Sequence, residues 1–287
     1  MKADPQEAKS CVSPEDASIE SLEALAAKLQ PSEKSAAPEI TAIPIYQPVT
    51  ASTLIDSLPE FPRLWTRMLL DAEHGAFVPP FLQEHDFGVL INAGDLFIRR
   101  ELTPGEEICV SLARGRVLEL GAGFGRVSRI LLERNMEVIA TDADPDVVAM
   151  YRARGWSEAT EVTLPDIPLS LGKFDTIIAL RGVLGLAGEL DQVLHGLQRI
   201  RELLNPGGRL IFTSSKVNNL LPLPGRSPLE YRYRMIYRGC RSPWQRVTAL
   251  PEWLSVPFLR ALGFTGIQTL DPSTSEGAGY YALASFG

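Results

Sequence analysis

Residues 117–126 read VLELGAGFGR, which places three glycines at alternate positions directly after a short apolar run. Gly121 permits a tight turn at the end of the run, and Gly123 lacks a Cβ where a ligand must pass close to the backbone. The stretch therefore predicts a strand, a ligand-binding loop and a helix that begins at about Arg126.

Strands and helices alternate from Arg116 onward. Short apolar runs recur at EVIATD, FDTIIAL and GRLIFTS, and stretches with helical spacing separate them. This alternation predicts βαβ units and a mostly parallel sheet. The last two runs, GIQTLD and YYALASF, have only a short linker between them, so we expect an antiparallel hairpin at the sheet edge.

An acidic residue follows the glycine loop at the spacing expected of a ribose-binding carboxylate. The next strand ends at Asp142, 21 positions beyond Gly121. A carboxylate there can accept hydrogen bonds from both hydroxyls of a ribose. The GxGxG spacing is one residue shorter than the dinucleotide-binding GxGxxG, and no Gly-Lys-Ser/Thr ends the loop. Glu119 would repel a pyrophosphate but suits an ammonium group. The expected ligand is a cationic nucleoside without phosphate.

These motifs resemble the first two motifs of class I S-adenosylmethionine-dependent methyltransferases. The resemblance includes FDTIIAL at 174–180, LNPGGRLIFT at 204–213 and LRALGF at 259–264. It implies an α/β, Rossmann-like fold with a seven-stranded, mostly parallel sheet that ends in an antiparallel hairpin. It also implies that S-adenosylmethionine is the cofactor, with its methionine part along Gly121 and Gly123.

The expected cofactor contacts are Glu119, Gly121, Ala122, Gly123, Arg126, Asp142, Ala143, Leu164 and Arg181. The resemblance implies that Asp142 holds the ribose and that Glu119 lies near the bound amino acid. Many members carry an Asp for the adenine amino group after the third strand; here Leu164 offers a backbone contact and an apolar edge. Arg181 follows the fourth strand and either binds a carboxylate or forms a surface ion pair.

The chain divides by composition into three parts. Residues 1–45 are expected to be largely flexible, with one helix over 13–31. Residues 46–112 are expected to form a helical cap without strands, and 113–287 the cofactor-binding α/β domain. An insertion at about 214–248 falls where such segments cover the active site and recognise substrate. Its YRYRMIYR alternates like a half-exposed strand.

Four residues are candidates for a catalytic role. The candidates are Tyr233 and Tyr237 in the insertion and His74 and His85 in the cap, since histidine is the usual base for hydroxyl methylation. An ordinary exposed histidine is the expected state for both His74 and His85.

Composition narrows the function classes. A net charge of −7 argues against bulk nucleic-acid binding, and no apolar run approaches the ~18 residues of a membrane span. Three cysteines without a CxxC pair argue against a disulfide framework or a metal site. With no apolar segment after MKADPQEAKS, we expect a cytoplasmic protein, monomeric or homodimeric.

The predicted function is methyl transfer from S-adenosylmethionine to a small molecule, for example in secondary metabolism. The Asn/Asp-Pro-Pro-aromatic motif of nucleic-acid and glutamine methyltransferases is absent after the fourth strand. Two alternatives stay open. One is a cyclase of the same fold, which would convert the cofactor into azetidine-2-carboxylate and methylthioadenosine. The other is a non-catalytic cofactor-binding partner protein.

Overall fold

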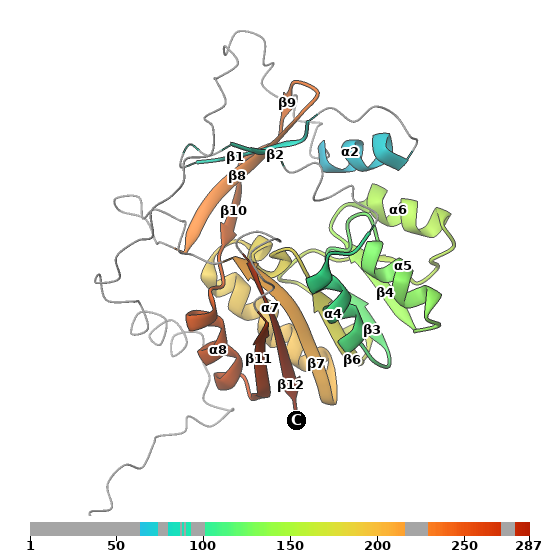
Figure 1. The fold of residues 1–287 in the computed structure, drawn as a ribbon, viewed down its shortest axis with the longest axis vertical. Helices are drawn as coiled ribbons and strands as arrows, with labels where there is room; N and C mark the ends of the chain where they lie inside the picture. Colours follow the sequence, from blue (N-terminus) through green and yellow to red (C-terminus); the bar gives the residue numbers. More distant parts are fainter. Residues whose placement is uncertain are drawn as a thin grey trace, which may run out of the picture.

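The computed structural model describes residues 64–73, 80–86, 88, 90–92, 101–215, 229–270 and 279–287. The helix expected over 13–31 and the candidate His74 lie outside these residues. The described part forms a large sheet flanked by helices, with a second, smaller sheet beyond one end of it (Figure 1).

The large sheet has seven strands in the order β11–β12–β7–β6–β3–β4–β5. Strands β7, β6, β3, β4 and β5 are parallel, and β12 runs antiparallel to both β7 and β11. The strands are β3 (Val117–Glu119), β4 (Val138–Asp142), β5 (Thr160–Glu161), β6 (Phe174–Ala179), β7 (Leu204–Ser215), β11 (Phe264–Leu270) and β12 (Gly279–Phe286). This arrangement confirms the predicted fold class, including the closing hairpin.

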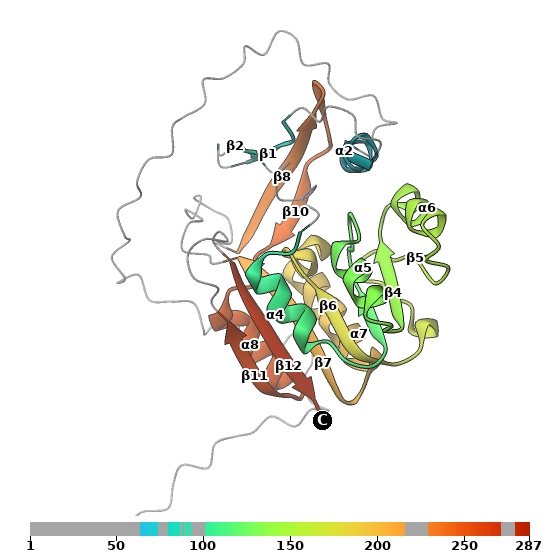
Figure 2. The ribbon, with the colours of Figure 1, turned by 45° about the vertical axis from the view of Figure 1, so that its right-hand side comes forward.

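Helices cover both faces of the large sheet, which is why most residues of its central strands are buried. On one face α4 (Pro104–Leu112) and α5 (Arg126–Glu133) share a buried cluster with the strands. On the other, α7 (Leu190–Leu203) and α8 (Glu252–Ala261) do the same (Figure 2). A further helix, α6 (Pro145–Ala153), follows β4. None of the helices among the described residues is long and apolar enough to cross a membrane.

The second sheet joins strands from two distant parts of the chain. Its order is β10–β8–β1–β2, with β9 paired to β8, and every pairing is antiparallel. The strands are β1 (Leu82–His85), β2 (Leu90–Asn92), β8 (Glu230–Tyr237), β9 (Cys240–Arg241) and β10 (Gln245–Thr248). The strand expected at YRYRMIYR is therefore confirmed as β8, the centre of this sheet.

The expectation of a purely helical cap is wrong. Residues 46–112 do contain α2 (Leu64–Glu73) and α4, but β1 and β2 lie between these helices. The two strands have only four and three residues, too few for a period-2 pattern to stand out. They depend on a partner far along the chain, because Glu84 of β1 lies opposite Arg234 of β8, 150 residues later.

One edge of the second sheet rests on the α/β part at the short helix η3 (Val183–Ala187). The Thr248 hydroxyl donates a hydrogen bond to the Gly188 carbonyl at 2.6 Å. A Cβ on Gly185 would lie 2.3 Å from the Thr248 carbonyl oxygen and 3.2 Å from Val247 Cγ1. Only glycine therefore allows β10 to approach η3 this closely.

Gly185→Ala is expected to destabilise the protein by about 1–3 kcal/mol, because the added methyl overpacks against backbone that cannot rotate away. Urea unfolding measures the effect. Gly196→Ala is the matched control: Gly196 lies inside α7, and among the described residues beyond its own helix backbone the added Cβ meets no atom closer than 3.7 Å. This variant should be neutral or stabilising by up to ~1 kcal/mol. Equal stability of the two variants would contradict the proposed close packing.

Candidate functional site

The glycine loop leads from β3 into α5 through three residues with left-handed backbone. Gly121, Gly123 and Gly125 have φ of 60°, 57° and 74°, a conformation that costs glycine little and other residues more. The Ala122 amide donates to the Thr141 carbonyl of β4 at 2.8 Å. The loop is thus pinned to the neighbouring strand, and α5 begins at Arg126 as the sequence predicts.

Asp142 lies at the end of β4, directly beside this loop. Its Oδ2 accepts a hydrogen bond from the Gly123 amide at 3.1 Å, and its Oδ1 accepts one from the Asp144 amide at 3.1 Å. Burial raises the pKa of Asp142, and the backbone amides act in the opposite direction. The aspartate that the spacing singled out is therefore brought against Gly123 at the carboxyl end of the sheet.

Helix α6 and the turn after it hold the loop from its other side. The Tyr151 hydroxyl donates to the Gly123 carbonyl at 2.7 Å, and the Arg154 guanidinium donates to the Phe124 carbonyl at 2.9 Å. A Cβ on Gly125 would lie only 2.5 Å from Cη2 and Cζ3 of the Trp156 ring, so the ring packs directly against this glycine. These contacts fix the loop in one conformation. No sequence motif marks the residues that make these contacts.

Glu119 is buried at the end of β3, two residues before the loop. Desolvation raises its pKa to about 7, against the opposing effect of a hydrogen bond that it accepts from the Ser128 hydroxyl. The positive charge of Arg126 also lowers the pKa of Glu119. Near neutral pH this carboxyl is therefore poised between its neutral and ionised forms.

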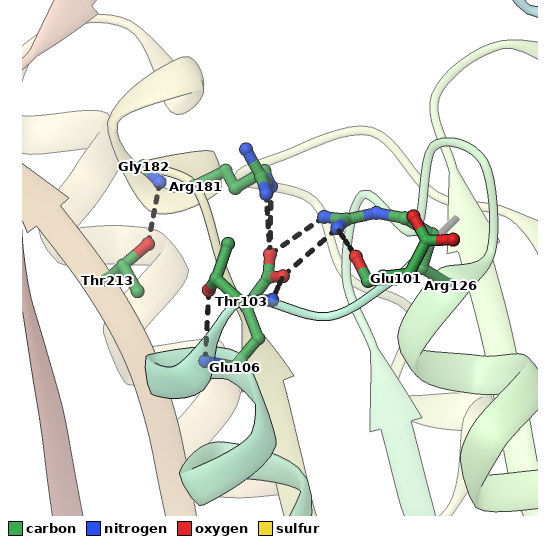
Figure 3. Close-up of polar contacts among 7 residues, drawn as sticks. All are labelled: Glu101, Thr103, Glu106, Arg126, Arg181, Gly182 and Thr213. Carbon is green, nitrogen blue, oxygen red and sulfur yellow. Dashed lines mark hydrogen bonds and ion pairs between the residues drawn. The ribbon is translucent and has the colours of Figure 1, made fainter. Parts of the chain in front are cut away.

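A second buried carboxylate, Glu106, gathers the two arginines near the loop (Figure 3). Arg126 Nη2 lies 2.7 Å from Glu106 Oε1, and its Nη1 lies 3.0 Å from Oε2. Arg181 binds the same Oε1 through Nε and Nη2, both at 2.9 Å. Glu106 also closes the capping box of α4, where its Oε2 accepts from the Thr103 amide at 2.9 Å.

The ion pairs give Glu106 a distinct electrostatic environment. Burial alone would raise its pKa, but the hydrogen bonds and charges of Arg126 and Arg181 hold the pKa below its usual value. The carboxylate thus ties together the starts of α4 and α5 and the turn after β6. Sequence analysis missed Glu106; the only available signal was its place three residues after Thr103.

Arg181 occupies a backbone conformation unusual for its residue type. Its φ is 58° and that of Gly182 is 72°, and the Gly182 amide donates to the Thr213 hydroxyl at 3.1 Å. The Arg181 side chain keeps 25% of its surface exposed while its partner Glu106 is 2% exposed. Of the two alternatives for Arg181, an ion pair is present, but its partner is a buried carboxylate rather than a surface group.

The remaining cofactor candidates flank the same edge of the sheet. Ala143 follows Asp142 and is exposed. Leu164 lies in the loop after β5 and packs partly buried against the main core. No described residues form a group of three or more His, Cys, Asp or Glu side chains that could hold a metal ion.

The three candidate catalytic residues that the structure describes lie on the second sheet. Tyr237 is fully buried, and its hydroxyl hydrogen-bonds Asp71 Oδ2 of α2 at 2.9 Å. His85 and Tyr233 lie opposite each other on β1 and β8, and the His85 ring stacks on Tyr231 at 5.5 Å between centroids. The expectation of an exposed His85 is wrong: it is 8% exposed, because these tyrosines pack against it.

One face of the second sheet spans the region from the glycine loop to η3. At one end Tyr237 packs with Phe81 and the α2 residues, in a cluster that also contains Ala122. At the other end Tyr231 lies opposite Val247, which contacts η3 at Gly185. His85 and Tyr233 therefore belong to the η3 end, whereas Tyr237 is a structural link to α2.

Comparison with known proteins identifies the central part of the chain. Residues 118–210 match the model of a family described as "Methyltransferase domain". An uncharacterized methyltransferase of Mycobacterium bovis, and two of Mycobacterium tuberculosis, are 31% identical over 99 residues, 34% of this chain and 39% of theirs. The match thus spans about two fifths of the length of these relatives.

Solved structures extend the similarity in fold. A methyltransferase from Bacteroides fragilis, crystallised with S-adenosylhomocysteine, superposes with a TM-score of 0.68 at 22% identity, over 80% of this chain and 97% of that one. The CcbJ methyltransferase from Streptomyces caelestis has a TM-score of 0.52 at 15% identity, over 63% and 88%. Residues 118–210 therefore match a methyltransferase domain, and the chain shares its fold with these solved methyltransferases.

Proposed function

We propose that this chain binds S-adenosylmethionine at the carboxyl ends of β3 and β4 and transfers its methyl group to a small molecule. The observation that carries the proposal is the pair of buried carboxylates, Glu119 and Asp142, at adjacent strand ends around one glycine loop. A carboxylate suits a ribose diol, and a second one suits an ammonium group. The cofactor of the superfamily carries both.

The loop residues fit this cofactor. An ionised carboxylate has about four acceptor positions, and the two backbone hydrogen bonds of Asp142 leave capacity for the ribose hydroxyls. The backbone of Gly121, Ala122 and Gly123 would line the methionine part. Ala143 and Leu164 would border the adenine.

Arg126 and Arg181 would bind the carboxylate of the same methionine part. Glu106 fixes both guanidinium groups beside the loop, and Arg181 stays partly exposed. A guanidinium held in this way can meet a carboxylate without losing much further conformational entropy. Opposite charges at Glu119 and Arg181 would then match the ammonium and carboxylate of one amino acid.

We propose further that the acceptor lies under the η3 end of the second sheet. His85 and Tyr233 face the same side as Tyr231 and Val247, and η3 directly follows Arg181 and Gly182 at the end of β6. Residues 46–112 and the insertion at 214–248 would thus form a mixed helix and strand cap on a cofactor domain of residues 113–287. His85 is the favoured base, because burial lowers its pKa and keeps the imidazole neutral.

Methyl transfer requires little covalent chemistry from the protein. The sulfonium supplies the leaving group, so the chain must align acceptor, methyl and sulfur and exclude water. The loop and its clamps would fix the cofactor, and the cap would fix the acceptor.

Product analysis tests the proposed reaction. The protein is incubated with S-adenosylmethionine alone and then with panels of small hydroxyl and amine compounds, and mass spectrometry identifies the products. S-adenosylhomocysteine that forms only with an acceptor supports methyl transfer. Methylthioadenosine without an acceptor would instead indicate the cyclase alternative, and lack of cofactor binding by calorimetry would indicate a non-catalytic protein.

Cofactor affinity is expected to rise by up to about tenfold from pH 5.5 to 7, because Glu119 ionises over this range. Because the pKa of Glu119 is about 7, its carboxyl group is mostly protonated and uncharged at pH 5.5. Calorimetry measures the affinity at each pH. The whole range lies below the pKa of the ligand's α-amino group, so that group stays protonated throughout. Glu119→Gln should remove the slope, and methylthioadenosine, which lacks the amino acid, should bind without it. A slope that survives in Glu119→Gln would contradict this role.

A further inference from the structure

Gly123 is buried although its loop lies beyond the carboxyl ends of the strands. The side chain above it is Trp65 of α2: among the described residues, the atom nearest to a Cβ built on Gly123, outside the adjoining residues, would be Trp65 Cζ2 at 3.2 Å. The indole therefore approaches the backbone where the proposed cofactor must pass. Trp65 belongs to the cap and to no sequence motif.

Several contacts hold α2 in this position. Asp71 accepts hydrogen bonds from the Tyr237 hydroxyl at 2.9 Å and from Arg238 Nε at 2.8 Å. The Trp65 ring meets Phe81 edge-on, with 5.8 Å between centroids. Trp65 packs against a single apolar cluster that contains α2 residues, Phe81 and Ala122 of the loop. The contact between Trp65 and the loop is thus part of a continuous core.

On the basis of the proposed function, we propose that the Trp65 indole forms the wall of the cofactor site that faces the sulfonium. The benzo edge of the indole lies 3.2 Å from the position that a Cβ on Gly123 would take, so the indole borders the loop where the cofactor would pass. An aromatic face attracts a cation electrostatically, and tryptophan does so most strongly. The Glu119 carboxylate would bind the ammonium group. The sulfonium forms no hydrogen bond, so it is stabilised best by an apolar surface with negative electrostatic potential, such as an aromatic face.

The difference between S-adenosylmethionine and S-adenosylhomocysteine isolates this contact, because the second molecule lacks the sulfonium charge. Calorimetry with both ligands is carried out on the full chain and on Trp65→Leu, Trp65→Phe and Trp244→Leu. Trp244 is the matched control: it is 39% exposed, and Arg234 lies over its ring at 4.5 Å. Thermal unfolding of each variant reports whether the fold is retained.

We expect Trp65→Leu to weaken S-adenosylmethionine about three- to tenfold more than S-adenosylhomocysteine. Trp65→Phe should recover most of the difference, and Trp244→Leu should leave both affinities unchanged. Equal losses for the two ligands in Trp65→Leu would overturn the inference and leave the proposed function standing. If the unaltered chain binds neither ligand, the proposed function fails and this inference with it.

Discussion

Replacement of Glu106 by glutamine is expected to lower the free energy of unfolding by about 3–5 kcal/mol, because it leaves the buried guanidinium of Arg126 without its charge partner. Glu106 and Arg126 have side chains that are 2% and 9% exposed, so water cannot compensate well. The same change should weaken cofactor binding, since Arg126 and Arg181 lose the group that orients them. Urea unfolding and calorimetry measure the two effects.

The effect of Glu106→Gln should also depend on pH. The folded protein holds the Glu106 pKa below its ordinary value, so its stabilising contribution is present above that ordinary value and disappears as pH falls through the folded one. The unaltered protein and the variant should therefore converge in stability under acid conditions. Glu107→Gln, at an exposed neighbouring position, should change stability by no more than ~0.5 kcal/mol. If the two variants unfold alike at neutral pH, Glu106 does not have this structural role.

Asp142→Ala is expected to weaken S-adenosylmethionine by about tenfold to a hundredfold, since a hydrogen bond to a charged group contributes roughly 1.5–3 kcal/mol. The loss has two sources: the ribose loses its acceptor, and the Gly123 amide loses the carboxylate that holds the loop. Asp142→Asn keeps one oxygen for that amide and should lose less. Calorimetry with adenosine, which contains the ribose but no methionine, should show the same ranking.

A matched change at Asp146 provides the control for Asp142. Asp146 lies in the first turn of α6 and is exposed, so Asp146→Ala removes an equal charge near the site without touching the loop. Its cofactor affinity should match that of the unaltered chain. Unchanged affinity in Asp142→Ala would mean that the ribose lies elsewhere.

The parts of the site that the sequence predicts are those with local signals. The alternation of glycines with an apolar run identifies the loop, and the distance to Asp142 follows from the length of one βα unit. The turn after β6 was marked only by position, which is why the partner of Arg181 was left open. The strand β4 and the helix α5 were likewise predictable, because their apolar residues recur at regular local spacing in the sequence.

The remaining features depend on contacts that no local pattern encodes. Glu106 lies 20 residues before Arg126 and 75 before Arg181, and its sequence context indicates only a helix cap. The strands β1 and β2 extend a sheet because β8 pairs with β1, and β2 has only exposed residues and pairs with β1. Trp65 reaches Gly123 through tertiary packing alone.

The pairing of β1 with β8 sets the order in which the molecule can be completed during synthesis. Asp71 meets Tyr237 across 166 residues, so the second sheet cannot assemble until β8 and β10 have left the ribosome. At roughly 5–20 residues per second, the earlier strands wait about 10–30 s without their partner. An unpaired strand edge invites association with other chains. The nascent chain is therefore most in need of chaperone protection after its α/β strands begin to form and before residue 248 emerges.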